Sequence, residues 1–425
     1  MTSLQDIASC IGGYDPRALP VAQAQEFIRR LVPKVQVVEH LPLRSALGRV
    51  LAQDIVSTLN VPASDNSAMD GYALRAAELQ PGAATTLRLA GSGFAGQPFG
   101  GTVGRGECVR IMTGAVMPAG TDTVLPQELA SVAGEHITVP DGVLRPGDNR
   151  RLAGEDLRLG DAALRAGRLL RPADLGLMAS LGRAEVPVLR KLRVAFFSTG
   201  DELRSVGEPL DAGCVYDSNR YTLWGMLQRL GVDMLDRGVV RDEPALLEAA
   251  FSHAAANADA VITSGGVSVG EADHTKQVMA ALGDVLFWTI AMRPGRPMAI
   301  GRIASGGHDA ILFGLPGNPV AVMVTFYAFV RDALLAMSGA GVELLPMLKA
   351  ASTSAIRKKP GRTEYQRGSV SKAADGSLRV AVTGSQGSGI LRSMSEANGL
   401  VVLHHEQGPV AAGEFVDVLP FDGLV

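Results

Sequence analysis

The sequence predicts a multidomain α/β protein with a doubly wound, mostly parallel sheet at its centre, and three observations lead to this fold class. Residues 191–340 alternate compact apolar runs with amphipathic segments, the pattern of a parallel sheet covered by helices on both faces. Residues 50–145 combine many glycines with short apolar runs and turn residues, which indicates a β-rich inserted domain. Residues 341–425 return to short strands and turns, so we expect a C-terminal β domain.

Within the central segment, the hydrophobic pattern predicts the order of the elements. We expect strands at residues 191–198, 234–240, 259–263, 285–290, 298–302 and 310–315. We expect helices at 218–230, 244–257, 272–282 and 319–337. Outside this segment, the pattern predicts helices at 21–32 and 172–181, and strands at 85–90, 108–112, 123–126, 136–139, 372–383, 399–404 and 414–419.

Composition and charge argue against several classes of protein. The chain has 425 residues, enough for about three domains of ~150 residues, and 47% of them are hydrophobic. A net charge of −3 argues against a general surface for nucleic acid or anionic membranes. Three distant cysteines, Cys10, Cys108 and Cys214, suggest neither a disulfide framework nor a cysteine zinc site. The N-terminus lacks the basic start of a secretory signal, and the apolar run 320–330 is shorter than the ~20 residues of a membrane span, so we expect a cytoplasmic protein.

Polar and glycine-rich motifs follow the predicted strands at the point where each strand ends. In open α/β sheets, ligands bind beyond the carboxyl ends of the strands. The motifs there are STGDE at 198–202, VRDE at 240–243, SGGVSVGEAD at 264–273, RPGRP at 293–297 and LPGNP at 315–319. They would gather several carboxylates, two arginines and a glycine-rich turn in one crevice. Each of Asp201, Asp242 and Asp273 could on its own be a helix N-cap, but like charges gathered at one site need a counter-charge.

The motif SGGVSVGEAD combines features that suit opposite charges. The turn at 264–266, between a strand and a helix, presents backbone N–H groups to an anion such as phosphate. Glu271 and Asp273 follow at once, and carboxylates repel phosphate. A hard divalent cation removes the conflict, because Mg²⁺ is commonly held by one or two carboxylates together with substrate phosphates. Arg293 and Arg296 could then bind other anionic groups, and the whole set suits phosphoanhydride chemistry assisted by Mg²⁺.

A second set of polar motifs lies before the α/β segment. Residues 65–73 read DNSAMDGYA, with two aspartates among small and polar residues and neither a strand nor a helix period. RIMTGA at 110–115 ends a strand with a hydroxyl and a glycine, and NRRLAGED at 149–156 places two arginines near two carboxylates. The simplest interpretation of residues 65–73 is an Asx-turn loop that connects two elements at the surface, unless a ligand binds it.

Taken together, these motifs resemble the molybdopterin molybdenumtransferase family, which includes MoeA-type proteins and the E domain of gephyrin. The resemblance covers about residues 15–422. It rests on DNSAMDGYA (65–73), RIMTGA (110–115), GED (154–156), STGDEL (198–203), YDSN (216–219), SGGVSVGEAD (264–273), RPGRP (293–297), LPGNP (315–319) and PGRTEYQRG (360–368). So many motifs in the family's order make the resemblance specific.

The resemblance implies four domains in each protomer and a homodimer. An elongated, discontinuous N-terminal domain would contain residues 1–49 and 146–190, interrupted by the β-rich domain at 50–145. The molybdopterin-binding α/β domain would span 191–340, followed by the C-terminal β domain at 341–425. In this family the active site lies between the α/β domain of one protomer and the β-rich domain of the other.

The resemblance also implies the reaction and its residues. Molybdate is inserted into adenylylated molybdopterin while the phosphoanhydride is hydrolysed with Mg²⁺, which gives AMP and molybdenum cofactor. Carried over motif by motif, the catalytic residues are Asp70, Thr113, Asp156, Glu202 and Asp242, and the Mg²⁺ ligands are Glu202, Asp242 and Asp273. The substrate-binding residues are Gly265, Gly266, Ser268, Arg151, Arg293, Arg296, Pro316, Pro319, Arg362 and Ser388. The N–H groups of the two glycines would meet phosphate, and Asp70 and Thr113 would orient water or molybdate.

Further partners and two rival functions belong to the same resemblance. The adenylyltransferase of the pathway and recipient molybdoenzymes are possible partners, and neither nucleic acid nor a membrane is expected. A molybdopterin adenylyltransferase shares the α/β domain and the SGG loop, but residues 1–190 and the DNSAMDGYA loop favour the later step. The other alternative is a gephyrin-like scaffold that binds receptor tails, although the chain offers no long linker or second enzymatic domain for that role.

Overall fold

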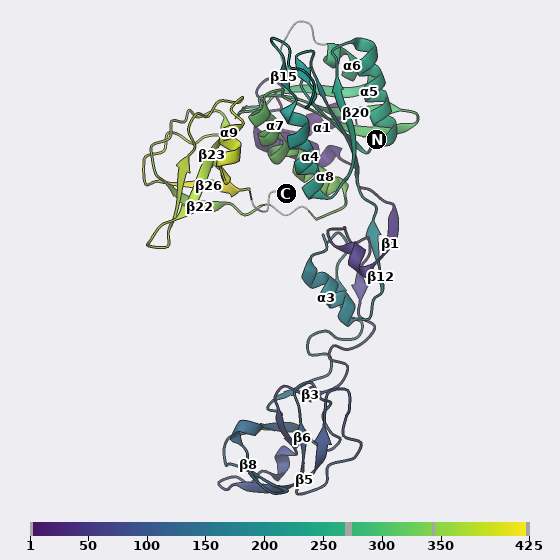
Figure 1. Ribbon diagram of the computed structural model, residues 1–425, viewed down its shortest axis with the longest axis vertical. Coiled ribbons are helices and arrows are strands. Elements are labelled where there is room, and N and C mark those ends of the chain that lie inside the picture. The colour runs from purple at the N-terminus through teal and green to yellow at the C-terminus, as the bar shows by residue number, and fades with distance from the viewer. Residues whose placement is uncertain (1–2, 268–273, 342–344, 422–425) are drawn as a thin grey trace. The chain divides into compact units, whose positions relative to one another are not determined.

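The computed structural model describes residues 3–267, 274–341 and 345–421 (Figure 1). The chain forms two compact units. The first contains residues 1–39, 48–52 and 188–425, and the second contains residues 40–47 and 53–187. Each unit has its own sheets and its own hydrophobic core.

The first unit is built on a six-stranded sheet with the order β16-β13-β17-β21-β20-β18. The strands are β13 (Arg193–Thr199), β16 (Asp233–Val240), β17 (Ala260–Ser264), β18 (Gly283–Thr289), β20 (Pro297–Ser305) and β21 (His308–Leu315). Four of them, β13, β16, β17 and β21, are parallel. At one edge β20 pairs antiparallel with β21, and β18 pairs antiparallel with β20. The central strands are nearly continuous apolar runs because both faces of the sheet are covered.

Helices cover both faces of this sheet. One face carries α1 (Leu4–Ser9), α2 (Val21–Leu31), α4 (Ser218–Leu230), α7 (Pro319–Thr325) and α8 (Arg331–Met337), and the other carries α5 (Pro244–Asn257) and α6 (His274–Leu282). Successive strand residues point to opposite faces. Phe196 of β13 therefore joins the first hydrophobic cluster and Phe197 joins the second, and both are fully buried. The predicted doubly wound arrangement is confirmed.

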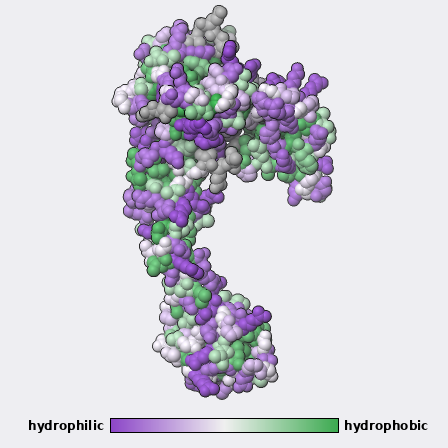
Figure 2. Space-filling model, turned by 180° about the vertical axis from the view of Figure 1, so that it is seen from behind, coloured by the Kyte–Doolittle hydropathy of each residue, from purple (hydrophilic) through white to green (hydrophobic). Residues whose placement is uncertain are grey.

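The helix predicted at 319–337 is continuous, with a change of winding in its middle. A π-helical turn, Phe326–Val330, separates α7 from α8. Gln25 Nε2 donates to the Ala328 carbonyl of this turn at 3.0 Å. Pro319–Met337 is long and apolar enough to cross a membrane, but 72% of its most apolar window is buried. It is therefore a core helix. On the face of the molecule shown in Figure 2, hydrophilic side chains are interspersed with smaller hydrophobic patches.

The C-terminal part of the first unit is a closed β barrel. Its strands are β22 (Leu348–Ser352), β23 (Thr363–Lys372), β24 (Leu378–Val382), β25 (Gly399–Leu403) and β26 (Phe415–Pro420), and the short helix α9 spans Arg392–Glu396. Closure occurs because β23 pairs with both β24 and β25. A further strand, β19 (Met292–Arg293), belongs in sequence to the α/β segment but pairs in parallel with β23. Main-chain pairing therefore ties the barrel to the segment that carries RPGRP.

The second unit is β-rich. Its six-stranded sheet has the order β7-β4-β6-β5-β9-β8. The strands are β4 (Gly71–Leu74), β5 (Thr85–Gly93), β6 (Glu107–Ile111), β7 (Thr123–Pro126), β8 (Ser131–Ala133) and β9 (His136–Val139). Short pairs join β2 (Ile55–Val56) to β11 (Ala162–Leu164) and β3 (Asn66–Ser67) to β10 (Arg150–Arg151), and α3 spans Pro172–Ser180. β1 (Val38–Pro42) pairs with β12 (Glu185–Leu189), and each of these strands runs from one unit into the other.

One predicted element is wrong, and it lies in the C-terminal barrel. The strand predicted at 372–383 is shorter, because residues 373–377 form a turn in which the Ala373 N–H donates to the Ser377 carbonyl at 2.8 Å. Residues 378–382 form β24, and Lys372 is the last residue of β23. β23 itself was not predicted. Its sequence, TEYQRGSVSK, buries polar side chains and so lacks the apolar alternation of an ordinary strand. The division into four domains stays a prediction.

Candidate functional site

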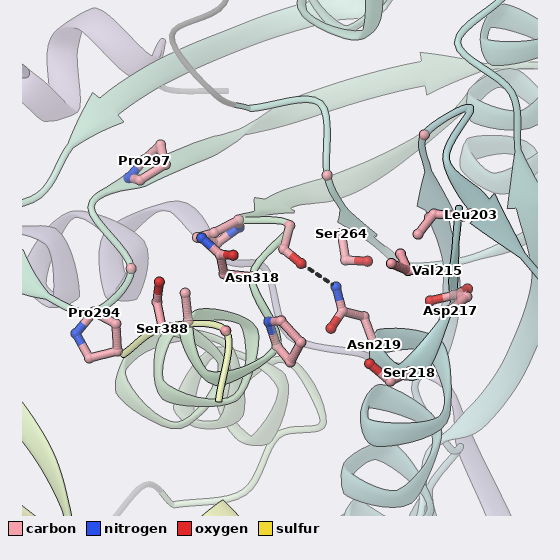
Figure 3. A pocket seen from close by; sticks show the side chains of 18 of the residues that line it. Leu203, Val215, Asp217, Ser218, Asn219, Ser264, Pro294, Pro297, Asn318 and Ser388 are labelled. Carbon is pink, nitrogen blue, oxygen red and sulfur yellow. Dashed lines mark hydrogen bonds between the residues drawn. The ribbon is translucent and has the colours of Figure 1, made fainter. Parts of the chain in front are cut away.

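A cavity of about 1010 Å³ opens at the carboxyl ends of the parallel strands, within the first unit (Figure 3). All five motifs predicted to follow strand ends contribute to its wall. The lining residues are Thr199, Gly200, Glu202, Leu203, 215–219, Asp242, 264–266, 293–297, 316–319, Ala321 and 386–389. Open parallel sheets bind ligands at this edge, and the volume suits a ligand of nucleotide size or larger.

The turn after β17 requires glycine at two positions. Gly265 and Gly266 have φ of 97° and 67°, a left-handed region that other residues rarely adopt. A Cβ on Gly265 would lie 2.4 Å from the Thr199 carbonyl oxygen, and one on Gly266 would lie 2.5 Å from Thr275 Cγ2. The Gly265 N–H donates to the Leu315 carbonyl at 3.1 Å. That N–H is therefore already used, and the expected contact with phosphate can apply only to Gly266.

Two of the predicted Mg²⁺ ligands, Glu202 and Asp242, line the cavity from the ends of neighbouring strands. The Glu202 carboxylate folds back over Gly200, where a Cβ would meet its Oε2 at 2.5 Å. Asp242 Oδ1 accepts a hydrogen bond from Thr275 Oγ1 at 3.3 Å. The Asp242 N–H donates to Asp201 Oδ1 at 3.2 Å, so Asp201 orients the loop that carries Asp242.

These carboxylates fit a Mg²⁺ site that a substrate completes. Mg²⁺ is usually bound by one or two carboxylates together with phosphate oxygens and water, and Glu202 and Asp242 border one cavity. Glu243, and not Asp242, is the N-cap of α5, so helix capping does not explain Asp242. Among the described residues, no three metal-binding side chains form a cluster. Asp273, the third predicted ligand, and Ser268, a predicted substrate contact, lie outside those residues.

Arg293 and Arg296 bring positive charge to the cavity from the turn between β18 and β20, and both side chains are exposed. Gly295 has φ of 90°, and a Cβ there would lie 2.4 Å from Thr325 Oγ1, so the turn is pressed against α7. The Ile290 N–H donates to the Arg296 carbonyl at 2.7 Å. Arg293 is held by the pairing of β19 with β23. The main chain fixes both arginines at their base, and their guanidinium groups are placed to bind anions.

The barrel supplies another part of the wall at residues 386–389, which include the predicted Ser388. The Val320 N–H of α7 donates to the Ser388 carbonyl at 3.0 Å and holds this loop to the α/β part. Arg362, also predicted to bind substrate, is not among the lining residues. Its Nε donates to Glu364 Oε1 at 2.8 Å instead.

The buried arginine behind this loop is Arg367, which the sequence analysis did not single out. It is 1% exposed and donates to Ser393 Oγ at 3.0 Å and to the carbonyls of Gly387 and Ser385 at 3.0 and 3.3 Å. Burial and the neighbouring Arg293 lower the pKa of Arg367 to about 10. Arg367 therefore braces the cavity wall from behind.

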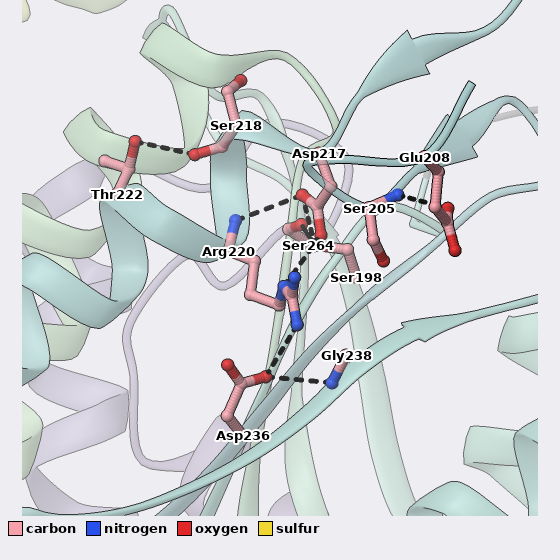
Figure 4. Close-up of polar contacts among 10 residues, drawn as sticks. All are labelled: Ser198, Ser205, Glu208, Asp217, Ser218, Arg220, Thr222, Asp236, Gly238 and Ser264. Atoms are coloured by element: carbon pink, nitrogen blue, oxygen red, sulfur yellow. Dashed lines mark hydrogen bonds and ion pairs between the residues drawn. The ribbon is translucent and has the colours of Figure 1, made fainter. Parts of the chain in front are cut away.

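Three buried polar residues of the cavity were also missed: Asp217, Asn219 and Thr199 are 1%, 7% and 4% exposed. Asp217 is the N-cap of α4, and its Oδ1 accepts from Ser198 Oγ at 2.9 Å and from the Arg220 N–H at 3.2 Å (Figure 4). Burial raises the pKa of the Asp217 carboxyl. Asp217 Oδ2, Asn219 Oδ1 and Thr199 Oγ1 are buried without a hydrogen-bond partner in the described part of the chain. The sequence signals were STGDE, which contains Thr199, and YDSN, which has the pattern of a helix start, and neither shows that these oxygens lack a partner within that part of the chain.

Asp70, Thr113, Arg151 and Asp156 belong to the second unit, and none of them lines the cavity. The Thr113 hydroxyl and N–H both donate to Asp70 Oδ1 at 2.7 Å, and these bonds lower the pKa of Asp70. Arg151 of β10 is paired in register with Asn66 of β3. The loop at 65–73 therefore contacts two motifs that are distant in sequence, and it is more than a simple connector.

Comparison with known proteins covers nearly the whole chain. Residues 19–182 match the model of the MoeA N-terminal region (domain I and II), residues 195–336 that of a probable molybdopterin binding domain, and residues 349–421 that of the MoeA C-terminal region (domain IV). A molybdopterin molybdenumtransferase of Haemophilus influenzae is 42% identical over 408 residues, which are 96% of this chain and 100% of the relative. One from Nostoc sp. is 36% identical over 94% of this chain and 93% of the relative. The crystal structure of the molybdopterin biosynthesis moeA protein from Pyrococcus horikoshii OT3 is similar with a TM-score of 0.81 at 28% identity, covering 95% of this chain and 100% of that one.

Proposed function

The chain belongs to the molybdopterin molybdenumtransferase family and is an enzyme of molybdenum cofactor biosynthesis, and we propose that it inserts molybdate into adenylylated molybdopterin with Mg²⁺-dependent hydrolysis of the phosphoanhydride. The products are AMP and molybdenum cofactor. One observation carries this proposal: two carboxylates, two arginines and a glycine turn border the same cavity. Such a cavity can bind a substrate that carries phosphate groups together with an oxyanion such as molybdate.

The residues of the cavity divide the work between binding and charge control. The Gly266 N–H binds a phosphate oxygen, while Arg293 and Arg296 bind molybdate or a second phosphate oxygen through their guanidinium groups. Pro316, Pro319 and Ser388 form the wall beside them. Because these groups are attached to main chain that is already hydrogen-bonded, they need little rearrangement when negative charge develops on the phosphate oxygens.

Glu202 and Asp242 would hold Mg²⁺ together with Asp273. When bound there, Mg²⁺ would supply Lewis-acid stabilisation of the negative charge on the phosphate groups. The Thr275 hydroxyl and Asp201 keep the Asp242 loop in place for this role.

We also propose a homodimer whose second copy completes the cavity. Asp70 of the partner subunit and the partner subunit's Thr113 would orient water or molybdate, with the partner's Arg151 and the partner's Asp156 beside them. Support comes from the second unit, where Asp70, Thr113 and Arg151 are organised around the loop at 65–73, and none of the four residues lines the cavity. Arg362 would act from the barrel. We place the enzyme in the cytoplasm, with the adenylyltransferase of the pathway and recipient molybdoenzymes as partners.

The proposed reaction is tested with two conservative variants, Glu202→Gln and Asp242→Asn. Each keeps the size of the side chain but removes the charge that holds Mg²⁺. We expect AMP release from adenylylated molybdopterin to fall about 100-fold or more, with a higher Mg²⁺ concentration needed for half-maximal rate. Asp211→Asn, which changes an exposed carboxylate paired with Arg204, is the matched control and should keep the wild-type rate. Wild-type rates in both cavity variants would remove the metal role.

The proposed dimer is tested by mixing two inactive variants, Asp70→Asn and Asp242→Asn. If each site combines residues of two subunits, every mixed dimer contains one site with both substitutions and one site with neither. After unfolding and refolding a 1:1 mixture, about a quarter of all sites would then be wild type, so about a quarter of the activity should return. A site built from one chain alone would recover nothing.

A further inference from the structure

We propose that Asp217 and Asn219 recognise the N–H edge of the pterin ring at the α4 end of the cavity. This assignment rests on the proposed function, because it deepens the account of one substrate. In this assignment Asp217 and Asn219 determine which ring is bound, and they take no part in cleavage of the phosphoanhydride.

The first observation is that both residues carry a buried acceptor without a donor. Asp217 is 1% exposed and Asn219 is 7% exposed, both line the cavity, and they stand two residues apart at the start of α4. Asp217 Oδ2 and Asn219 Oδ1 have no hydrogen-bond partner among the described residues. Native proteins satisfy nearly all buried polar atoms, so two such acceptors in one cavity wall indicate donors that come from a ligand.

Local geometry fixes which atoms are left for the ligand. The cap of α4 uses Asp217 Oδ1, which accepts from Ser198 Oγ and from the Arg220 N–H (Figure 4). Asn219 Nδ2 donates to the Gly317 carbonyl at 2.7 Å, which leaves its oxygen as the free end of the amide (Figure 3). The Asn219 amide therefore cannot turn over without losing this bond, and the Asp217 carboxylate leaves one oxygen for the ligand whichever way it is turned.

Arg220 supplies charge but does not satisfy Asp217. Its Nε lies 3.6 Å from Asp217 Oδ2, beyond a good hydrogen bond, and its Nη1 lies 3.5 Å from Asp236 Oδ1 (Figure 4). The guanidinium offsets part of the cost of burying the Asp217 carboxylate.

The chemistry of the two acceptors selects the ring and not the anionic parts of the substrate. Phosphate and molybdate oxygens are acceptors and would be repelled by a carboxylate. A pterin presents a ring N–H beside an exocyclic amino group, and this pair of donors matches two neighbouring acceptors. Leu203 and Val215, which are paired between β14 (Leu203–Arg204) and β15 (Val215–Tyr216), line the same end and offer apolar surface to a flat ring.

The ribose of the nucleotide is the competing occupant, because its two hydroxyls are also donors. A carboxylate commonly binds a vicinal diol through both of its oxygens, but Asp217 Oδ1 is already occupied by the cap. The geometry therefore favours the pterin, with its phosphate directed towards Gly266 and the arginines.

The test is Asp217→Asn. Asparagine is as good an N-cap as aspartate, so the cap oxygen is retained while the free acceptor becomes an N–H₂ donor. Binding is measured by isothermal titration calorimetry with two probes, adenylylated molybdopterin and AMP, each with Mg²⁺. We expect affinity for adenylylated molybdopterin to fall about 10- to 100-fold, the size of one mismatched buried hydrogen bond, while AMP affinity changes less than about twofold. Asp211→Asn, the same change at an exposed carboxylate outside the cavity lining, is the matched control.

Other outcomes overturn the assignment. Equal weakening for AMP and for adenylylated molybdopterin would give Asp217 to the ribose, and unchanged affinity for both would leave it a cap only. If Asp217→Asn does not fold, Asn219→Ala carries the same comparison. The readout is binding without turnover. A protein that discriminates the pterin as expected but releases no AMP would contradict the proposed reaction and leave this assignment standing.

Discussion

Asp217 and Asp259 lie at opposite ends of one sheet, Asp217 buried and Asp259 half-buried, and their carboxylates differ in how they are paired. Asp259 precedes β17 at its amino end, and it accepts from Arg190 Nη1 and Nη2 at 2.8 and 2.7 Å and from the Arg193 N–H at 2.8 Å. Asp217 lies beyond the carboxyl ends and keeps one oxygen without a donor in the described residues. One carboxylate is fully satisfied by the chain, and the other is not.

The pKa values follow the same division. Burial would raise the pKa of Asp259, but the Arg190 guanidinium and the Arg193 N–H outweigh it and hold this pKa below the ordinary value. Burial raises the pKa of Asp217, and the bonds from Arg220 and Ser198 offset only part of the effect. The pairing of their carboxylate oxygens thus distinguishes the two aspartates: both oxygens of Asp259 are paired, and Asp217 Oδ2 has no hydrogen-bond donor among the described residues.

The largest effect should come from Asp259→Asn. This change removes the charge opposite Arg190 in a pair whose side chains are only 14% and 21% exposed. We expect the free energy of unfolding, measured in urea, to fall by about 3 kcal/mol, because the half-buried arginine is left without its counter-charge. Affinity for AMP should stay unchanged. If Asp259→Asn were as stable as wild type but bound AMP weakly, Asp259 would be a binding residue and not a structural one, which would contradict the comparison.

A smaller effect is expected for Arg367→Lys, which probes the cavity end of the same unit. Lysine keeps the charge but cannot reproduce the fork that reaches Ser393 and the carbonyls of Ser385 and Gly387. We expect a loss of about 1–2 kcal/mol in the free energy of unfolding and weaker molybdate binding by calorimetry. Arg392→Lys, at an exposed pair with Glu396, is the control and should change neither quantity.

The smallest effect is a difference in pH dependence between Asp217→Asn and Asp259→Asn. The folded pKa of Asp259 is below its unfolded value of 3.8, so its contribution to stability is full above about pH 4 and is lost as the pH falls through the folded pKa. The stability gap between wild type and Asp259→Asn should therefore narrow on acidification. The folded pKa of Asp217 is raised, so its ionisation disfavours folding as the pH rises above 3.8. Asp217→Asn should accordingly gain on wild type with rising pH, which urea titrations between pH 3 and 7 would measure.

The sequence was sufficient where apolar periodicity and the strand-end rule apply. All of β17 is buried and apolar or small, so it was recognisable, and the motif after it had to lie at the carboxyl edge. Arg367 was not recognisable, because only tertiary packing shows that it is buried behind the loop at 386–389. The sequence around Asp217 has the pattern of an ordinary helix N-cap. Its Oδ2 lacks a hydrogen bond within the described residues because Arg220 Nε lies 3.6 Å away, and only the folded structure shows this distance.

The pairing of β19 with β23 has a consequence for any exchange of parts between this protein and its relatives. Residues 292–293 pair with the barrel in space, although in the sequence they lie about 55 residues before β22, the first strand of the barrel. A chimaera joined just before β22 would pair a foreign β23 with a native β19, and a mismatch of register there would displace Arg293. If residues 292–297 were transplanted together with the barrel, β19 and β23 would come from the same parent and their register would be kept.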